Sequence, residues 1–157
     1  MAASGFKAIV SSLPFVKADL LTGLVAQKRF RNESERIFSR LAESDRVCSL
    51  LLISIDNFSQ WRAAVGHDAA YSSVGLAGRV LTRTLRPGDL IGRVGTAKFA
   101  MCLPDEVESD TRSLGERLCR VIEEAVREIG VKAECRYEVV TVEPAKTSFA
   151  VAMSKLQ

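Results

Sequence analysis

Residues 85–103 read LRPGDLIGRVGTAKFAMCL, and this stretch constrains the fold more than any other part of the chain. Pro87-Gly88 favours a tight turn, because proline presets the first turn dihedral and glycine accepts a positive φ at the next position. Two strand-like runs follow, over 89–94 and 98–103, joined tightly through Gly95-Thr96. The pattern predicts a β-hairpin and therefore an antiparallel pair at the heart of a sheet.

The rest of the chain alternates helical and extended patterns. The run CSLLLISI is apolar throughout and predicts a central strand, at 48–55, buried on both faces. A fourth strand is expected at 132–142, and helices are expected at 25–42, 58–65, 69–85, 114–129 and 147–156. This order predicts an α/β (α+β) fold in which a mostly antiparallel central sheet is flanked by helices, and it excludes a Rossmann pattern or a barrel.

Composition limits the classes of partner. A chain of 157 residues that is 47% hydrophobic is one ordinary domain. The 22 basic and 19 acidic residues are interspersed, which argues against nucleic-acid binding. Residues 1 to about 18 contain only a short apolar run, broken by Pro14, so we expect a lead-in helix or linker and no membrane insertion by this segment.

The cysteines argue against a metal site. They are widely spaced, form no C-x-x-C pair and are accompanied by a single histidine, His67, so no zinc constellation can be assembled. We therefore expect no cofactor and no structural metal. Small buried thiols are typical of a reducing, cytoplasmic compartment, and this reading applies to Cys48, Cys102, Cys119 and Cys135.

Four motifs occur in a specific order: DLLTGL at 19–24, LLLISIDNF at 50–58, Gly66-His67-Asp68, and the hairpin stretch LRPGDLIGRVGTAKF. Together they resemble the diguanylate cyclase (GGDEF) domain over residues 18 to about 105, and more loosely to 143. The resemblance implies a palm-like fold of the nucleotidyl cyclase type. It divides the chain into a lead-in at 1–17 and a degenerate GGDEF domain at 18–157 whose C-terminal end is shortened.

The resemblance also implies that the metal-binding chemistry has been lost. In the family, acidic side chains at the first strand and the hairpin hold two metal ions beside GTP. Here the first metal-binding aspartate corresponds to Ser54 and the second metal carboxylate to Ala97, with Lys98 beside it. Thr96 replaces the second glycine, and Asp56 matches an aspartate that is not the main ligand. A hydroxyl and a methyl group are poor substitutes for carboxylates around a hard cation, so we expect no catalytic residues and no bound metal.

Other positions are also altered. The guanine-recognising asparagine of the family corresponds to Arg62, and its partner aspartate to Tyr71. For Lys98 two readings stay open: a solvated hairpin residue, which is the common case for lysine, or an ammonium that pairs with Asp56 or binds an anion. His67 is expected to be a turn residue rather than a base.

The R-x-x-D motif Arg86-Pro87-Gly88-Asp89 is retained. In the family this motif is the inhibitory site (I-site), where the arginine pairs with guanine and the aspartate accepts its N–H groups. The alternative is a structural remnant, because Pro-Gly-Asp suits any turn between a helix and a strand. A ligand there also needs a further arginine, for which the candidates are Arg83, Arg93, Arg112 and Arg117.

Two functions are therefore in competition. The first is a catalytically inactive GGDEF-type regulatory domain that responds to cyclic di-GMP through Arg86 and Asp89. The second is a domain that has kept only the scaffold and serves protein interaction or dimerisation without any nucleotide. Under either function, a partner protein or a homodimer is expected.

Overall fold

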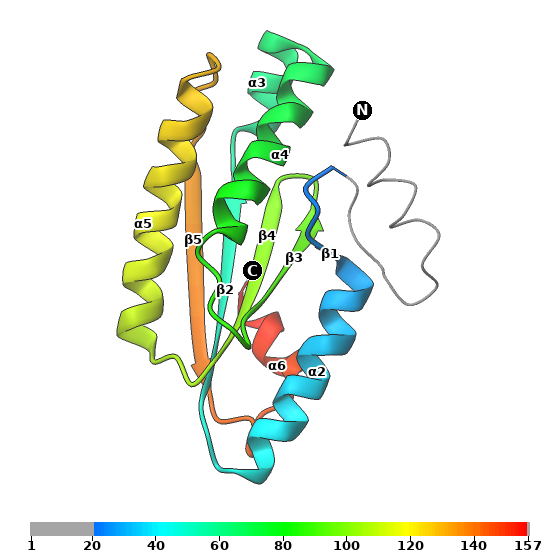
Figure 1. Ribbon diagram of the computed structural model, residues 1–157, viewed down its shortest axis with the longest axis vertical. Helices are drawn as coiled ribbons and strands as arrows, with labels where there is room; N and C mark the ends of the chain where they lie inside the picture. The colour runs from blue at the N-terminus through cyan, green and yellow to red at the C-terminus, as the bar shows by residue number, and fades with distance from the viewer. Residues whose placement is uncertain (1–20, 157) are drawn as a thin grey trace.

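The structure is a computed structural model that describes residues 21–156 (Figure 1). The lead-in helix or linker expected at 1–17 lies outside the described residues. In chain order the elements are β1 (Val25–Ala26), α2 (Gln27–Glu43), β2 (Cys48–Ile55), α3 (Phe58–Val65), α4 (His67–Thr82), β3 (Leu90–Gly95), β4 (Lys98–Pro104), α5 (Glu108–Arg127), β5 (Cys135–Val142) and α6 (Phe149–Ser154).

The strands form one five-stranded sheet in the order β1-β3-β4-β2-β5. β2 pairs antiparallel with both β4 and β5, and β3 pairs antiparallel with β4. The short strand β1, which the sequence pattern did not reveal, pairs in parallel with β3. The expected α/β fold with a mostly antiparallel central sheet is confirmed.

Helices cover both faces of the sheet (Figure 1). All eight residues of β2 are buried, as expected for a central strand. Leu51 and Ile53 pack into the core cluster that includes residues of α4 and α5, whereas Leu50 and Leu52 pack into the cluster beneath α2 and α6. Side chains that alternate along a strand face opposite sides, so one strand supplies both halves of the core.

The thiols follow the expected burial in three positions out of four. Cys48, Cys102 and Cys119 are buried, and Cys135 on β5 is half-exposed. The sulfur atoms of Cys48 and Cys102 lie 3.6 Å apart on neighbouring strands. All four are free thiols. The hydrogen bond with Cys102, together with burial, raises the pKa of the Cys48 thiol, which keeps it protonated.

The turn before the hairpin has the expected geometry. The Asp89 N–H donates to the Arg86 carbonyl over 3.0 Å, and Gly88 has φ +92°. A positive φ at the residue after Pro87 is what a type II turn requires, and glycine adopts it without steric cost. Both side chains of the R-x-x-D motif therefore leave the same short turn.

Two helix boundaries differ from the sequence prediction by more than two residues. α5 begins at Glu108, six residues before the start expected at 114. Glu108 and Asp110 stabilise this first turn through the helix dipole, and the buried Thr111 hydroxyl donates to the Val107 carbonyl. α4 begins at His67, directly after Gly66, and ends at Thr82. Residues 83–85 are not helical, so the prediction that this helix ends at Leu85 is wrong.

No helix within residues 21–156 combines the length and the apolar character needed to cross a bilayer.

Gly115 offers a test of the packing between α5 and the sheet. A Cβ atom at this position would lie 2.7 Å from Tyr137 Cδ2 and 3.0 Å from Leu51 Cδ1. Gly115→Ala should lower the free energy of unfolding by about 1–3 kcal/mol, because overpacking outweighs the gain in helix propensity. Urea unfolding measures the change. Glu116→Ala, at the exposed neighbouring position, is the control and should be close to neutral; equal stability of the two variants would contradict the packing seen here.

Candidate functional site

Arg86 is the most highly connected charged side chain of the retained motif. Its Nε and Nη2 atoms donate to the two carboxylate oxygens of Asp89, each over 3.1 Å. Nη1 lies 2.7 Å from Oε2 of Glu106, and Nη2 lies 3.4 Å from the Pro104 carbonyl oxygen. The guanidinium thus bridges the turn to the end of β4. The hydrogen bond with Asp89 raises the pKa of Arg86, with smaller contributions from the Glu106 and Asp105 charges.

Asp89 is held more tightly than its place in a surface turn suggests. Its side chain is only 4% exposed, whereas that of Arg86 is 53% exposed. One carboxylate oxygen also accepts the Arg86 backbone N–H over 3.0 Å. A buried carboxylate needs such partners, because an unpaired charge in this position is costly.

Cavities border the Arg86–Asp89 pair on two sides. One, of about 310 Å³, is also lined by Glu106, Asp110 and Arg117. Among the candidates for the further arginine, Arg117 is therefore the one that lines a cavity together with Arg86 and Asp89. Arg93 donates instead to carbonyls of the hairpin, and Arg112 pairs with Glu108.

The second cavity, of about 450 Å³, brings two further arginines toward the motif. Arg40 at the end of α2 and Arg46 in the following loop both line it, together with Arg86. Sequence reasoning missed them because they precede the motif by about forty residues, and only the fold places α2 beside the turn. The sequence signal is limited to Arg40, a basic residue in the last turn of α2, where a cation interacts favourably with the helix dipole.

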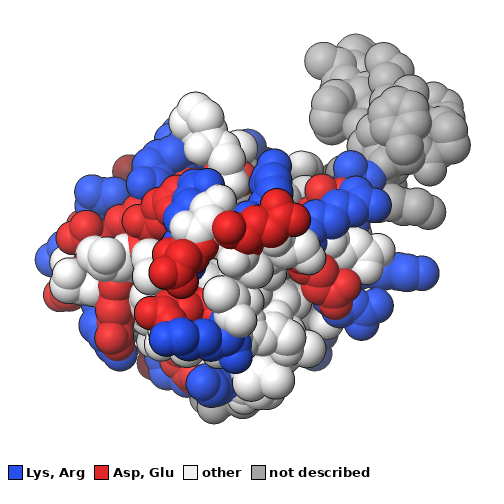
Figure 2. Space-filling view, turned by 90° about the horizontal axis from the view of Figure 1, so that it is seen from below, with Lys and Arg blue, Asp and Glu red and all other residues white. Residues whose placement is uncertain are grey.

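The face of the molecule seen from below in Figure 1 carries both signs of charge. Figure 2 shows Lys and Arg interspersed with Asp and Glu over this face, without a continuous area of one sign. A surface of this kind agrees with the mixed composition and offers no track for a polyanion.

Ser54 lies near the opposite end of β2. It is 4% exposed, and its strand partners are Lys98 on β4 and Arg136 on β5. Ala97 is also buried, at 6% exposure, and its carbonyl accepts the Ile55 N–H over 3.0 Å. Thr96 is exposed, and its carbonyl oxygen accepts from Arg93 over 2.8 Å. The fold therefore brings Ser54, Ala97 and Lys98 together, as the resemblance implied.

Asp56 has a different partner from the one considered for it. The sequence left open a pair with Lys98, but Asp56 accepts from Nε of Arg136 over 3.0 Å, and Arg136 also pairs with Glu138. This interaction raises the pKa of Arg136, with the hydrogen bond to Asp56 as the largest cause. Lys98 is exposed, consistent with the reading as a solvated hairpin residue.

The positions that correspond to guanine recognition form an aromatic cluster. The guanidinium carbon of Arg62 lies 5.8 Å from the centre of the Phe58 ring. Tyr71 packs edge-on against Phe58, with ring centres 5.4 Å apart, and stacks on His67 at 4.4 Å. His67 was expected in a turn, but it is the first residue of α4, and its ring stacks on Tyr71. Arg62 and Tyr71 thus contact side chains of their own domain.

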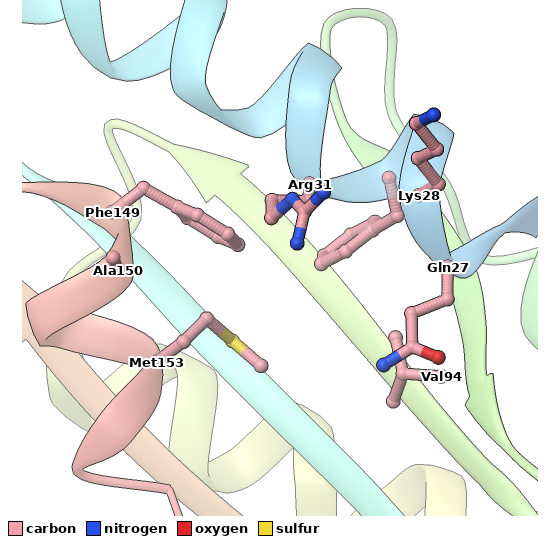
Figure 3. A pocket seen from close by; sticks show the side chains of 8 residues that line it. Gln27, Lys28, Arg31, Val94, Phe149, Ala150 and Met153 are labelled. Carbon is pink, nitrogen blue, oxygen red and sulfur yellow. The ribbon is translucent and has the colours of Figure 1, made fainter.

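A third cavity, of about 460 Å³, lies between α2, β3 and α6 (Figure 3). Its walls include Phe149 and Met153 of α6 and Val94 of β3, with Gln27 and Arg31 from α2. Neither Arg86 and Asp89 nor Ser54, Ala97 and Lys98 are among the residues that line it.

Comparison with known proteins decides the family. Residues 16–147 match the family model described as "Diguanylate cyclase, GGDEF domain". This chain belongs to the GGDEF family. Among curated relatives, the probable diguanylate cyclase DgcC of Escherichia coli K12 is 31% identical over 85 residues, which is 54% of this chain and 23% of that protein. DgcT of the same organism is 25% identical over 118 residues, 75% of this chain and 26% of that protein. The chain thus spans about a quarter of the length of these relatives.

Solved structures of GGDEF domains share the fold. The GGDEF domain of DgcB from Caulobacter crescentus, in complex with c-di-GMP, has a TM-score of 0.81 at 20% identity, covering 89% of this chain and 82% of that one. The FimX GGDEF domain of Pseudomonas aeruginosa has a TM-score of 0.79 at 14% identity, covering 89% and 88%. The palm-like GGDEF fold expected from the sequence is confirmed.

The divalent cations implied by the GGDEF family do not fit the residues present. Ser54 offers a neutral hydroxyl, Ala97 offers no ligand atom, and Lys98 and Arg136 add positive charge on either side of Ser54. Hard cations take oxygen ligands, and carboxylates above all. Within residues 21–156 no group of three or more His, Cys, Asp or Glu side chains is placed to hold a metal ion.

The ion pair between Arg46 and Asp105 allows a pH test near the R-x-x-D motif. Arg46 lowers the pKa of Asp105, mainly through their hydrogen bond. An acid whose pKa is lower in the folded state stabilises the fold at pH values above its unfolded-state pKa, which is about 3.9 for aspartate. This contribution is lost as the pH falls through the folded-state pKa. In Arg46→Gln the Asp105 pKa should rise toward 3.9, as measured by NMR titration of the carboxyl carbon. Arg36→Gln, which removes a pair with Glu33 instead, should leave it unchanged. An unaltered Asp105 pKa in Arg46→Gln would contradict the pairing.

Proposed function

We propose that this chain is a catalytically inactive GGDEF regulatory domain, in a cytoplasmic setting, that binds cyclic di-GMP through Arg86 and Asp89. The observation that carries the proposal is the Arg86–Asp89 pair on one tight turn, bordered by cavities into which further arginines extend. A guanidinium presents parallel donors that match O6 and N7 of guanine, and a carboxylate accepts from its N–H groups. The solved DgcB domain, whose structure contains c-di-GMP, lends support by sharing this fold.

Arg117 is the proposed third contact. It lines the same cavity as Arg86 and Asp89 but comes from α5, so a ligand in that cavity could contact both the turn and the helix. A second positive charge there suits the phosphodiester groups of a cyclic dinucleotide, because arginine binds phosphate oxygens through two parallel donors.

The proposed inactivity follows from the chemistry of the altered positions. Phosphoryl transfer depends on carboxylate-held metal ions that position and neutralise the triphosphate. Ser54 and Ala97 cannot replace those ligands, and Arg136 with Lys98 would repel a divalent cation.

Calorimetric titration with cyclic di-GMP tests the binding site. The chain should bind with a Kd in the micromolar range or tighter, and Arg86→Ala should reduce the affinity at least about tenfold, since a bidentate arginine–guanine pair is worth about 1–3 kcal/mol. Arg112→Ala is the matched control, because Arg112 pairs with Glu108 on the exposed side of α5. No binding heat at high ligand concentration would remove the proposal.

An assay with GTP tests the absence of catalysis. Incubation with GTP and Mg²⁺ or Mn²⁺ should yield no cyclic product by chromatography, because the metal ligands are missing. The double variant Ser54→Asp, Ala97→Asp restores two carboxylates and should bind Mn²⁺ more tightly than the unaltered chain. Formation of cyclic di-GMP by the unaltered chain would overturn the assignment as a non-enzyme.

The alternative is a nucleotide-independent interaction or dimerisation domain, which the apolar cavity between α2 and α6 favours (Figure 3). Met153 lines this cavity, and Val151 on the same helix is 51% exposed. If this function is the correct one, self-association or partner capture should be lost in Met153→Glu, whereas Arg86→Ala should have no effect.

A further inference from the structure

We propose that the Glu106 carboxylate competes with guanine for one edge of the Arg86 guanidinium and thereby sets the affinity of the Arg86 turn for its ligand. This inference rests on the function proposed above and deepens it. Glu106 lies at the start of the loop between β4 and α5 and has no counterpart in the R-x-x-D motif itself. Its carboxylate lies 2.7 Å from Nη1 of Arg86.

The donors of Arg86 are almost fully used. A guanidinium has five N–H groups. Those of Nε and Nη2 that face Asp89 are taken by its two oxygens at 3.1 Å, and Nη2 also points at the Pro104 carbonyl oxygen at 3.4 Å. Nη1 faces Glu106. Guanine needs two parallel donors for O6 and N7, so it must take over one complete edge of this group.

Displacing Asp89 from its edge of the guanidinium costs more free energy than displacing Glu106. The Asp89 side chain is 4% exposed, so a base that displaced it would leave a buried carboxylate without its partner. The other edge, formed by Nη1 and Nη2, is held by Glu106, whose side chain is 18% exposed, and by the long contact to Pro104. A ligand therefore enters on the Glu106 side and must displace that carboxylate.

The backbone holds Glu106 in this place. Its carbonyl oxygen accepts the Ser49 hydroxyl over 2.7 Å, and its N–H donates to the Leu103 carbonyl over 3.4 Å. Ser49 belongs to the buried strand β2, so the position of Glu106 is fixed by the centre of the sheet. The carboxylate is thus presented to Arg86 by the fold.

Titration of the full chain with cyclic di-GMP tests the inference. Glu106→Gln keeps the length of the side chain and removes the charge, and it should lower the Kd about tenfold, because a neutral acceptor competes less well than a carboxylate for the guanidinium. Glu106→Ala should give a change in the same direction. Glu108→Gln is the control, since that carboxylate pairs with Arg112 and should leave the Kd unchanged. Thermal unfolding verifies that each variant is folded.

The outcomes separate this inference from the proposed function. Tighter binding by Glu106→Gln supports the inference, and it does so even if the unaltered chain shows no binding, which would overturn the proposed function for the native sequence alone. Equal or weaker binding by Glu106→Gln, with binding by the unaltered chain, overturns the inference and leaves the proposed function standing. Failure of every protein to bind overturns both. A merely structural role for Glu106 would weaken binding on substitution, so the direction of the change decides.

Discussion

The burial of β2 fixes the distance between the Arg86 turn at one end of the sheet and Ser54 at the other. This strand is hydrogen-bonded on both sides and covered on both faces, so it cannot shift by one residue without turning its apolar side chains to the wrong core. Cys48 lies opposite Pro104, and Ser54 lies opposite Lys98. At about 3.3 Å per residue, the R-x-x-D end and the Ser54 end of the sheet are separated by roughly 20 Å of strand.

Internal ion pairs dominate both ends of the sheet. At one end Arg136 is held by Asp56 and Glu138, and at the other Arg86 is held by Asp89 and Glu106. Arg136 and Asp56 are about half-exposed, so their pair contributes little to stability, whereas the Asp89 carboxylate that holds Arg86 is buried. The pairs fix the orientation of each guanidinium, but they also use its hydrogen-bond donors. Under the proposed function, a ligand of Arg86 exchanges with a carboxylate of the protein.

The sequence predicted the elements well where local chemistry decides them. The apolar run of β2, the Pro87-Gly88 turn and the hairpin all appear where expected, because their patterns depend on neighbouring residues. α5 begins six residues before the start that the sequence predicts, because acidic residues at 108–110 resemble a polar loop in the sequence. In the structure these residues are stabilised by the helix dipole, and the Thr111 hydroxyl donates to the Val107 carbonyl. The two-residue strand β1 gives no pattern, because its pairing with β3 is entirely nonlocal.

The amino-acid sequence by itself determined the family resemblance, the R-x-x-D motif with Arg86 and Asp89, and the residue types Ser54 and Ala97 on which the proposed inactivity rests, because these are matters of residue type at fixed spacing. The tertiary structure alone decided which charges meet. Arg136 reaches Asp56 across eighty residues, and Arg86 meets Glu106 because β4 returns the chain beside the turn. Coulomb interactions depend on separation in space, and spacing along the chain does not give that separation for residues on different strands.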